Sequence, residues 1–140
     1  AWGWAMNTPF PWYKQIASHL GATRNGMVVS WPSRIPAAGM RDQYLFASDV
    51  MPTILEAARI DPPASVDGVQ QQAIDGISFA YSFDNPSAPS RRTRQAFETF
   101  TNLGIYDSGW LANTSPARAA WEVSNGNKVP LSERNWELYD

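Results

Sequence analysis

The stretch "DVMPTILEAAR", residues 49–59, carries the clearest secondary-structure signal in this chain of 140 residues. Val50, Ile54 and Ala58 recur every four residues, which is the spacing of one face of an α-helix. Pro52 falls in the first turn, where the missing N–H is not needed. The pattern predicts an amphipathic helix over this stretch, and the Asp-Pro-Pro that follows ends it.

Two segments before this helix indicate the fold class. The apolar run "GMVVSW", Gly26–Trp31, ends at a proline and predicts a short buried strand, of the kind found in parallel sheets. A short helix is predicted earlier, over Tyr13–Leu20. A strand, a loop and an amphipathic helix in that order indicate an α/β layer. We therefore expect residues 1–85 to form the end of a mixed or parallel sheet with packed helices.

The last part of the chain, residues 86–140, has another pattern. Short stretches alternate between apolar and polar residues, and Asp107-Ser108-Gly109 between two of them is typical of a hairpin turn. A final extended stretch is predicted over residues 136–139. These signals predict a small antiparallel C-terminal sheet. The alternating stretches are 95–100, 104–106 and 110–112.

Composition and charge exclude several classes of partner. The net charge of −2 creates no field that would gather nucleic acid or anionic lipid. We interpret the basic cluster of Arg91, Arg92 and Arg94 as solvated surface. The absence of cysteine excludes disulfides and a thiol nucleophile within this chain. No apolar run reaches the roughly 18 residues of a membrane span.

Both ends look cut, so we expect a fragment of a longer protein and assign no compartment.

The stretch "SWPSR", residues 30–34, raises the question of a serine nucleophile, because it reads S-x-P-x-R. A nucleophile that attacks an anionic ester profits from a helix N-terminus, where amide groups stabilise negative charge. The following residues, "IPAAG", do not favour the start of a helix. No neighbouring base is evident, and a serine needs one. The sequence therefore does not favour Ser30 as a nucleophile.

Lys14 and His19 are the candidate functional residues. A lysine ammonium can neutralise charge on a transferring sulfuryl or phosphoryl group, and a histidine can move protons. Their spacing alone favours the simpler interpretation of a surface lysine and a packed or solvated histidine. His19 is the only histidine, so this chain cannot hold a multi-histidine metal site. The acidic residues do not cluster, and we predict no metal ligand among them.

Several segments, taken in order, resemble the C-terminal part of an arylsulfatase of the alkaline-phosphatase superfamily. They match a Lys-containing segment that leads into a strand ending W-P, a D-x-x-P-T-[IL]-L helix, a D-G-x-S-[LF] turn, a hairpin, and a W-x-L-Y-D strand. In this chain "SWPSR" falls at the end of the family's strand and not at its nucleophile motif. The matching segments are "YKQIASHLGATRNGMVVSWP" (13–32), "DVMPTILEAARI" (49–60), "DGISF" (75–79), "IYDSGWLAN" (105–113) and "WELYD" (136–140).

The resemblance implies an incomplete alkaline-phosphatase-like sulfatase fold, divided into catalytic-domain residues 1–85 and a small subdomain over 86–140. It implies hydrolysis of aryl or alkyl sulfate esters, with the formylglycine nucleophile and the calcium ligands outside this chain. Lys14 matches the family lysine that contacts the sulfate ester, and is the residue to which catalysis and substrate binding are assigned. His19 matches a family histidine by position, which implies a substrate-binding role. Arg24 matches an arginine expected to be structural or to pair with a buried carboxylate.

Two other functions are compatible with the same residues. A phosphodiesterase or phosphonate monoester hydrolase of the same superfamily would need the same cation-rich anion site. A non-catalytic α/β interaction module, whose Trp-rich N-terminus would pack on a partner, is suggested by the seven tryptophans and the missing nucleophile motif. The resemblance implies a small-molecule sulfate ester and the missing part of the catalytic domain as partners, with no nucleic acid and no membrane span.

Overall fold

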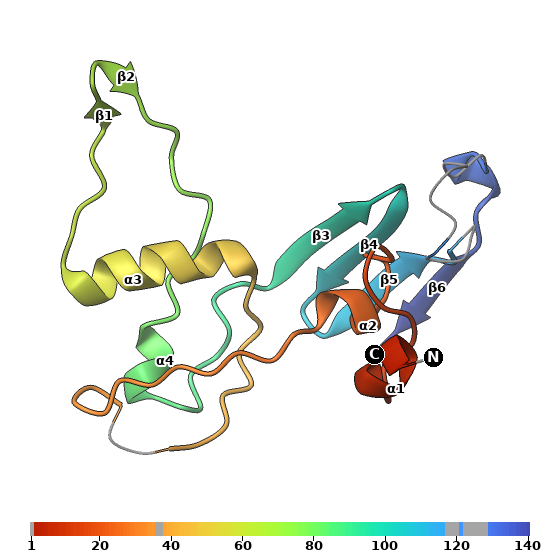
Figure 1. Ribbon diagram of the computed structural model, residues 1–140, viewed down its shortest axis with the longest axis horizontal. Helices are drawn as coiled ribbons and strands as arrows, with labels where there is room; N and C mark the ends of the chain where they lie inside the picture. The colour runs from red at the N-terminus through yellow and green to blue at the C-terminus, as the bar shows by residue number, and fades with distance from the viewer. Residues whose placement is uncertain (1, 36–37, 117–120, 122–128) are drawn as a thin grey trace. The chain divides into compact units, whose positions relative to one another are not determined.

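The computed structural model describes residues 2–35, 38–116, 121 and 129–140 as a mixed α/β protein with two antiparallel sheets (Figure 1). The chain divides into two compact units. Unit 1 combines Ala1–Val28 with Thr93–Asp140, and unit 2 is Val29–Arg92. The predicted boundary between residues 85 and 86 falls inside unit 2. That this boundary separates a catalytic domain from a small subdomain stays a prediction.

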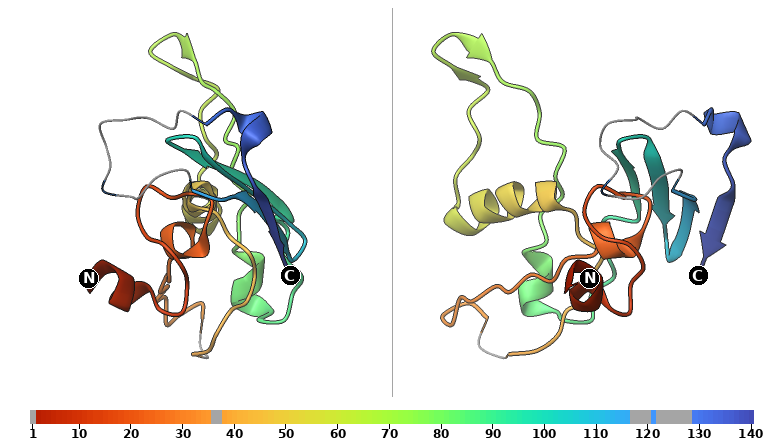
Figure 2. Two further views of the ribbon diagram at one scale, coloured as in Figure 1. Left: turned by 90° about the vertical axis from the view of Figure 1, so that its right-hand side faces the viewer. Right: turned by 45° about the vertical axis from the view of Figure 1, so that its right-hand side comes forward.

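The largest element of unit 1 is a four-stranded antiparallel sheet in the order β3-β4-β5-β6 (Figures 1 and 2). The predicted C-terminal antiparallel sheet is thus confirmed. The hairpin turn is also where the sequence puts it: Asp107 pairs with Trp110, and Ser108 and Gly109 both have positive φ. The strands are Arg94–Thr99 (β3), Asn102–Asp107 (β4), Trp110–Thr114 (β5) and Trp136–Tyr139 (β6).

Unit 1 also contains short helices and the loop that carries Lys14. The helix predicted over residues 13–20 is wrong, because these residues form turns and α2 begins only at Leu20. The reason is the backbone: Gln15, inside the predicted helix, has a φ of 77°, which no right-handed helix accommodates. The helices of unit 1 are Trp2–Asn7 (α1), Leu20–Thr23 (α2) and the 3₁₀ turn Leu131–Glu133 (η2).

Unit 2 is built around the predicted amphipathic helix, which the structure confirms as α3. The helix is preceded by a 3₁₀ turn and ends at Arg59, which adopts the left-handed conformation common after a helix. A long connection then carries a two-stranded ribbon before the short helix α4. The elements are Ala47–Asp49 (η1), Val50–Ala58 (α3), Ser65–Val66 (β1), Val69–Gln70 (β2) and Tyr81–Asp84 (α4).

The buried side of α3 is not the predicted apolar stripe. Val50, Met51 and Ile54 are exposed, whereas Thr53 is 4% exposed. Thr53 is buried, and its hydroxyl bonds to backbone on both sides: it donates to the carbonyl of Asp49, just before the helix, and accepts from the amide of Phe79. Polar contacts, and not the apolar stripe, therefore determine which side of α3 faces the rest of unit 2.

The strand predicted over Gly26–Trp31 is wrong. The structure assigns no strand there, and residues 26–31 are exposed. In the described ranges both sheets are antiparallel, so the predicted end of a mixed or parallel sheet is corrected as well. An apolar run forms a buried parallel strand only where neighbouring strands supply hydrogen bonds on both sides. Among the described residues, no helix is long and apolar enough to cross a membrane.

Candidate functional site

Residues 11–21, here called the Lys14 loop, are closed by contacts between their two ends. The amide of Gly21 donates to the carbonyl of Pro11 at 3.1 Å. The side-chain amide of Asn7 donates to the carbonyls of Trp12 and Gly21 at 3.1 and 2.9 Å. A Cβ atom on Gly21 would lie 2.1 Å from the Trp12 carbonyl oxygen, so only glycine permits this closure.

Strained backbone lies on both sides of Lys14. Trp12 and Gln15 have φ values of 66° and 77°, a conformation that costs bulky residues about 1–2 kcal/mol each. An asparagine side chain holds each strained carbonyl: Asn7 donates to Trp12, and Asn102 of β4 donates to Gln15 at 3.2 Å. Lys14 itself is exposed. The loop thus presents the ammonium group to solvent from a constrained backbone.

The second half of the Lys14 loop packs on one face of the sheet. The side chain of Asn113 on β5 is fully buried and donates to the Ser18 carbonyl at 2.6 Å. On β4, Gly104 leaves room for Ser18, since a Cβ atom there would lie 3.3 Å from the Ser18 Cα atom and carbonyl oxygen. These contacts bury Ile16 and Ser18 almost completely and fix the loop to the sheet.

His19 links the Lys14 loop to the last strand of the sheet. Its Nδ1 lies 2.8 Å from Ser18 Oγ and its Nε2 lies 3.1 Å from a Glu137 carboxylate oxygen on β6. The side chain is 4% exposed, and its ring also meets that of Trp12 at a centroid distance of 6.0 Å. Burial lowers the pKa of His19 below its ordinary 6.5, although the bond and the charge of Glu137 act in the opposite direction.

Glu137 is the centre of this polar network. Its carboxylate accepts hydrogen bonds from Ser115 Oγ at 2.7 Å and from the Tyr139 hydroxyl at 3.0 Å, besides the contact with His19. The bond from Ser115 is the main cause that lowers the pKa of Glu137, and burial only partly opposes it. Glu137 is therefore a carboxylate at neutral pH, matched to donors on three sides.

The structure brings the two sequence-predicted site residues onto one loop but gives them different surroundings. Lys14 is exposed, whereas both ring nitrogens of His19 are engaged within unit 1. Their assigned roles in ester binding stay predictions.

The residues that position this loop were not found from the sequence. Asn102, Asn113 and Glu137 reach it from strands that lie far along the chain. The sequence offered one signal for them: each is a polar residue of a strand that also contains apolar residues. Asn113, formally a glycosylation acceptor in "NTS", is fully buried in this structure.

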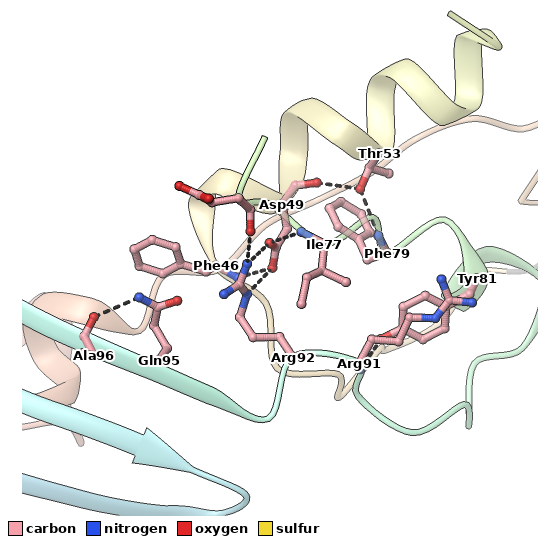
Figure 3. A network of polar contacts seen from close by, with 11 residues as sticks. Phe46, Asp49, Thr53, Ile77, Phe79, Tyr81, Arg91, Arg92, Gln95 and Ala96 are labelled. Atoms are coloured by element: carbon pink, nitrogen blue, oxygen red, sulfur yellow. Dashed lines mark hydrogen bonds and ion pairs between the residues drawn. The ribbon is translucent and has the colours of Figure 1, made fainter. Parts of the chain in front are cut away.

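Unit 2 contains a second polar network, drawn in Figure 3, around the carboxylate of Asp49. Arg92 Nε donates to Asp49 Oδ2 at 2.9 Å, and Arg92 Nη2 contacts Oδ1. The amides of Phe46 and Ile77 donate to the same carboxylate at 2.9 and 2.8 Å. Burial by itself raises the pKa of Asp49, but the bonds from Arg92 and the two amides outweigh burial, so the pKa is lowered.

The Asp49 network joins two stretches of unit 2 that the sequence analysis singled out, "DVMPT" (49–53) and "DGISF" (75–79). Asp49 and Thr53 belong to "DVMPT", and the amides that they bind, of Ile77 and Phe79, belong to "DGISF". Gly76 lies so close to η1 that a Cβ atom would be 2.1 Å from the Ser48 carbonyl oxygen. The motif residues therefore hold the start of helix α3 and the distant segment 75–79 together.

The interpretation of Arg91, Arg92 and Arg94 as solvated surface is wrong for Arg92, whose side chain is 12% exposed in its pair with Asp49. Arg91 is exposed and lies over the Tyr81 ring at 4.2 Å, and Arg94 forms an exposed ion pair with Asp107. A buried carboxylate is most easily kept ionised by a bidentate arginine, which is why Arg92 leaves the surface.

Arg24, the arginine expected to be structural or to pair with a buried carboxylate, lies over the Phe10 ring at 4.8 Å. In the described part of the chain, Arg92 and not Arg24 holds the buried carboxylate of Asp49. Ser30 is exposed in irregular structure and not at the end of a strand.

The residues described do not fit a calcium ion. No group of three or more His, Asp or Glu side chains in the described ranges could hold a metal. The buried carboxylate of Asp49 is already bound by Arg92 and two amides, so its oxygens are not free to serve as ligands.

Comparison of this chain with models of known protein families gives no match, and comparison with curated proteins gives none either.

Proposed function

We propose that this chain is the C-terminal part of a sulfatase that hydrolyses aryl or alkyl sulfate esters, and that Lys14 binds the ester. The observation that carries the proposal is the ordered set of arylsulfatase-like segments, in which Lys14 occupies the position of the ester-binding lysine. We propose that the fold is an incomplete alkaline-phosphatase-like one. Its support is that the structure contains both helices and β-sheets.

The surroundings of Lys14 support this role. An ester-binding group works best when its backbone is fixed before the substrate arrives, because no ordering is then needed at the moment of binding. The Lys14 loop meets this requirement through its closed ends, its strained flanks and its bonds to Asn102 and Asn113. The exposed ammonium can meet a sulfate ester with its positive charge and its three N–H donors.

The contacts inside unit 2 also support the resemblance. The residues shared with the D-x-x-P-T and D-G-x-S-F patterns are those that hold unit 2 together: Asp49, Thr53 and Gly76 each make a close contact that few other residues could replace.

Following the resemblance, the proposal assigns calcium and formylglycine to a part of the catalytic domain outside this sequence. This chain contributes the ammonium of Lys14 and the sheet that positions it. By itself it is expected to be inactive.

Substitution of Lys14 in the intact protein tests the proposal. Lys14→Gln is expected to lower kcat/KM for 4-nitrophenyl sulfate by about 10²–10³, the loss typical of one charge-stabilising donor. Lys14→Arg keeps the charge and should lose less. Arg59→Gln, which removes an exposed positive charge at the end of α3, serves as the control. Unchanged turnover in Lys14→Gln contradicts the assignment.

Phosphodiesterase or phosphonate monoester hydrolase chemistry is the alternative within the same superfamily. An ammonium at Lys14 would bind a phosphodiester as well as a sulfate ester, because both present anionic oxygens. Rates for matched 4-nitrophenyl sulfate, phosphodiester and phenylphosphonate esters separate the two. Faster hydrolysis of a phosphorus ester would replace the sulfatase proposal.

A non-catalytic interaction module is the second candidate, and the exposure of several tryptophans favours it. Trp110, Trp121 and Trp136 are each about half or more exposed. Exposed aromatic side chains are frequent anchors at protein interfaces. Residues 1–140 expressed alone discriminate: a monomer with a cooperative thermal transition favours an independent module, whereas aggregation favours part of a split domain.

A further inference from the structure

We propose that the hydrogen-bonded chain Ser18–His19–Glu137 is an acid-sensitive latch that fastens the Lys14 loop to strand β6. From this loop, His19 contacts the Glu137 carboxylate of β6. The importance of the latch for ester binding rests on the proposed function, but the latch itself does not.

One protonation state of His19 satisfies both of its neighbours. Glu137 can only accept, so Nε2 must carry a hydrogen and donate to the carboxylate. In the neutral ring Nδ1 is then an acceptor, and it takes the hydrogen of Ser18 Oγ at 2.8 Å. The side chain of Ser18 is as buried as that of His19, so no solvent competes for this bond. The closed latch therefore contains a neutral imidazole.

Protonation disrupts this arrangement at Nδ1. A second ring hydrogen would point at the Ser18 hydroxyl hydrogen, and Ser18 would have to turn that hydrogen away within a site that is 1% exposed. It would also place a positive charge in a buried position, which Glu137 offsets only in part. Both effects disfavour the closed latch in acid.

Among the groups in and around the latch, His19 is the one that titrates near neutral pH. Strand β6 contributes the Glu137 carboxylate and the Tyr139 hydroxyl, which ionise in more acidic and more alkaline ranges. Strands β4 and β5 contribute Gly104 and Asn113, which do not titrate. The loop itself contributes Ser18 and the Trp12 ring, while Lys14 is exposed.

The direction of the pH effect follows from the lowered pKa of His19. A histidine whose pKa is lower in the closed state stabilises that state above its ordinary pKa of 6.5 and loses this contribution as the pH falls. The hydrogen bonds between the strands of the sheet are made by backbone N–H and C=O groups, which do not titrate in this pH range. We therefore expect the Lys14 loop to open locally in mild acid while strands β3 and β4 stay paired.

Hydrogen exchange of the intact protein, followed by mass spectrometry, tests the latch. The amides of Ile16, His19 and Gly21 report on the closed loop, because each donates to a backbone carbonyl within it. After correction for intrinsic exchange, protection of residues 11–21 should fall about tenfold between about pH 7.5 and about pH 5. Peptides from residues 94–107 should keep their protection.

His19→Gln separates a titrating latch from a merely structural contact. Its side-chain amide nitrogen reaches about as far as Nε2 and can donate to Glu137, but it does not titrate. The variant should therefore keep the loop protected at the lower pH. Glu133→Gln, which removes an exposed carboxylate of η2 in the same unit, should behave like the wild type.

Two results overturn the latch: equal protection of residues 11–21 in the wild type at both pH values, or the same acid loss in His19→Gln. If the variant does not fold, the wild-type comparison alone still decides. Failure of the proposed function has a different signature, because Lys14→Gln would then leave ester turnover unchanged while the loop still opened in acid.

Discussion

Arg92 binds both carboxylate oxygens of Asp49, with Nε 2.9 Å from Oδ2, and neither residue is more than slightly exposed. The pair joins the end of unit 2 to the start of helix α3, 43 residues earlier. Because the amides of Phe46 and Ile77 bind the same carboxylate, one ionised group organises three separated segments (Figure 3).

Removal of Arg92 should destabilise the protein strongly. Arg92→Met leaves the Asp49 carboxylate buried with two amides but without a counter-charge, a change that typically costs about 3–5 kcal/mol. Urea unfolding followed by tryptophan fluorescence measures the loss. The matched control is Arg94→Met, which breaks the exposed pair with Asp107 and should cost less than about 1 kcal/mol. Equal losses in the two variants would show that the Asp49 network is not a stabilising element.

Asp49 should also contribute to the acid sensitivity of the protein. Its pKa is lower in the folded state than the ordinary 3.8, so its contribution to stability is complete above pH 3.8 and disappears as the pH falls through the folded-state value. Asp49→Asn is expected to be less stable than the wild type at neutral pH and to show a smaller further loss in acid. Unfolding midpoints across the acid range measure this difference, and parallel curves for the two proteins would contradict it.

Gly76 should not tolerate a side chain. In Gly76→Ala the new Cβ atom would meet the Ser48 carbonyl oxygen at 2.1 Å and Pro52 Cγ at 2.8 Å, so η1 and the "DGISF" segment would have to separate. A loss of more than about 2 kcal/mol is expected, since overpacking against backbone commonly costs 1–3 kcal/mol. Gly26→Ala is the control, because nothing lies within 4 Å of its Cβ position. A neutral Gly76→Ala would mean that the two segments do not meet as described.

The hydroxyl of Thr53 should matter more than its methyl group. Thr53→Val keeps the shape but leaves the Phe79 amide without its acceptor, at a cost of about 1–3 kcal/mol. Thr53→Ser keeps the hydroxyl and removes one methyl group, worth about 0.8 kcal/mol. Exchange of the Phe79 amide gives an independent readout, and it should accelerate in Thr53→Val but not in Thr53→Ser. The reverse order of stability would assign the role of Thr53 to apolar packing.

Local signals explain the predictions that hold. Helix α3 follows from the recurrence of Val50, Ile54 and Ala58 every four residues, with a proline in the first turn. The β4–β5 hairpin follows from Asp107-Ser108-Gly109, since turns with positive φ favour such residues. Both signals act over a few residues and need no distant partner. The sequence therefore predicted them correctly.

Apart from the helix predicted over residues 13–20, which the backbone of Gln15 excludes, two failed predictions depended on distant partners. The run Gly26–Trp31 has the composition of a buried strand, but within the part of the chain that the structure describes no strand pairs with it. The apolar stripe of α3 predicted the wrong buried face, because Thr53 and Asp49 form hydrogen bonds with residues more than twenty positions away. A periodic pattern shows which face is apolar, and it does not show what covers that face.

The sequence by itself determined α3, the β4–β5 hairpin, the antiparallel C-terminal sheet, and Lys14 and His19 as candidate functional residues. Only the tertiary structure decided that Asn102, Asn113 and Glu137 hold the Lys14 loop, and that Arg92 leaves the surface to bind Asp49. The physical reason is that helix propensity and turn chemistry act between near neighbours in the chain. A buried polar group must instead find its partner wherever the fold provides one, and here Glu137 lies 118 residues from His19.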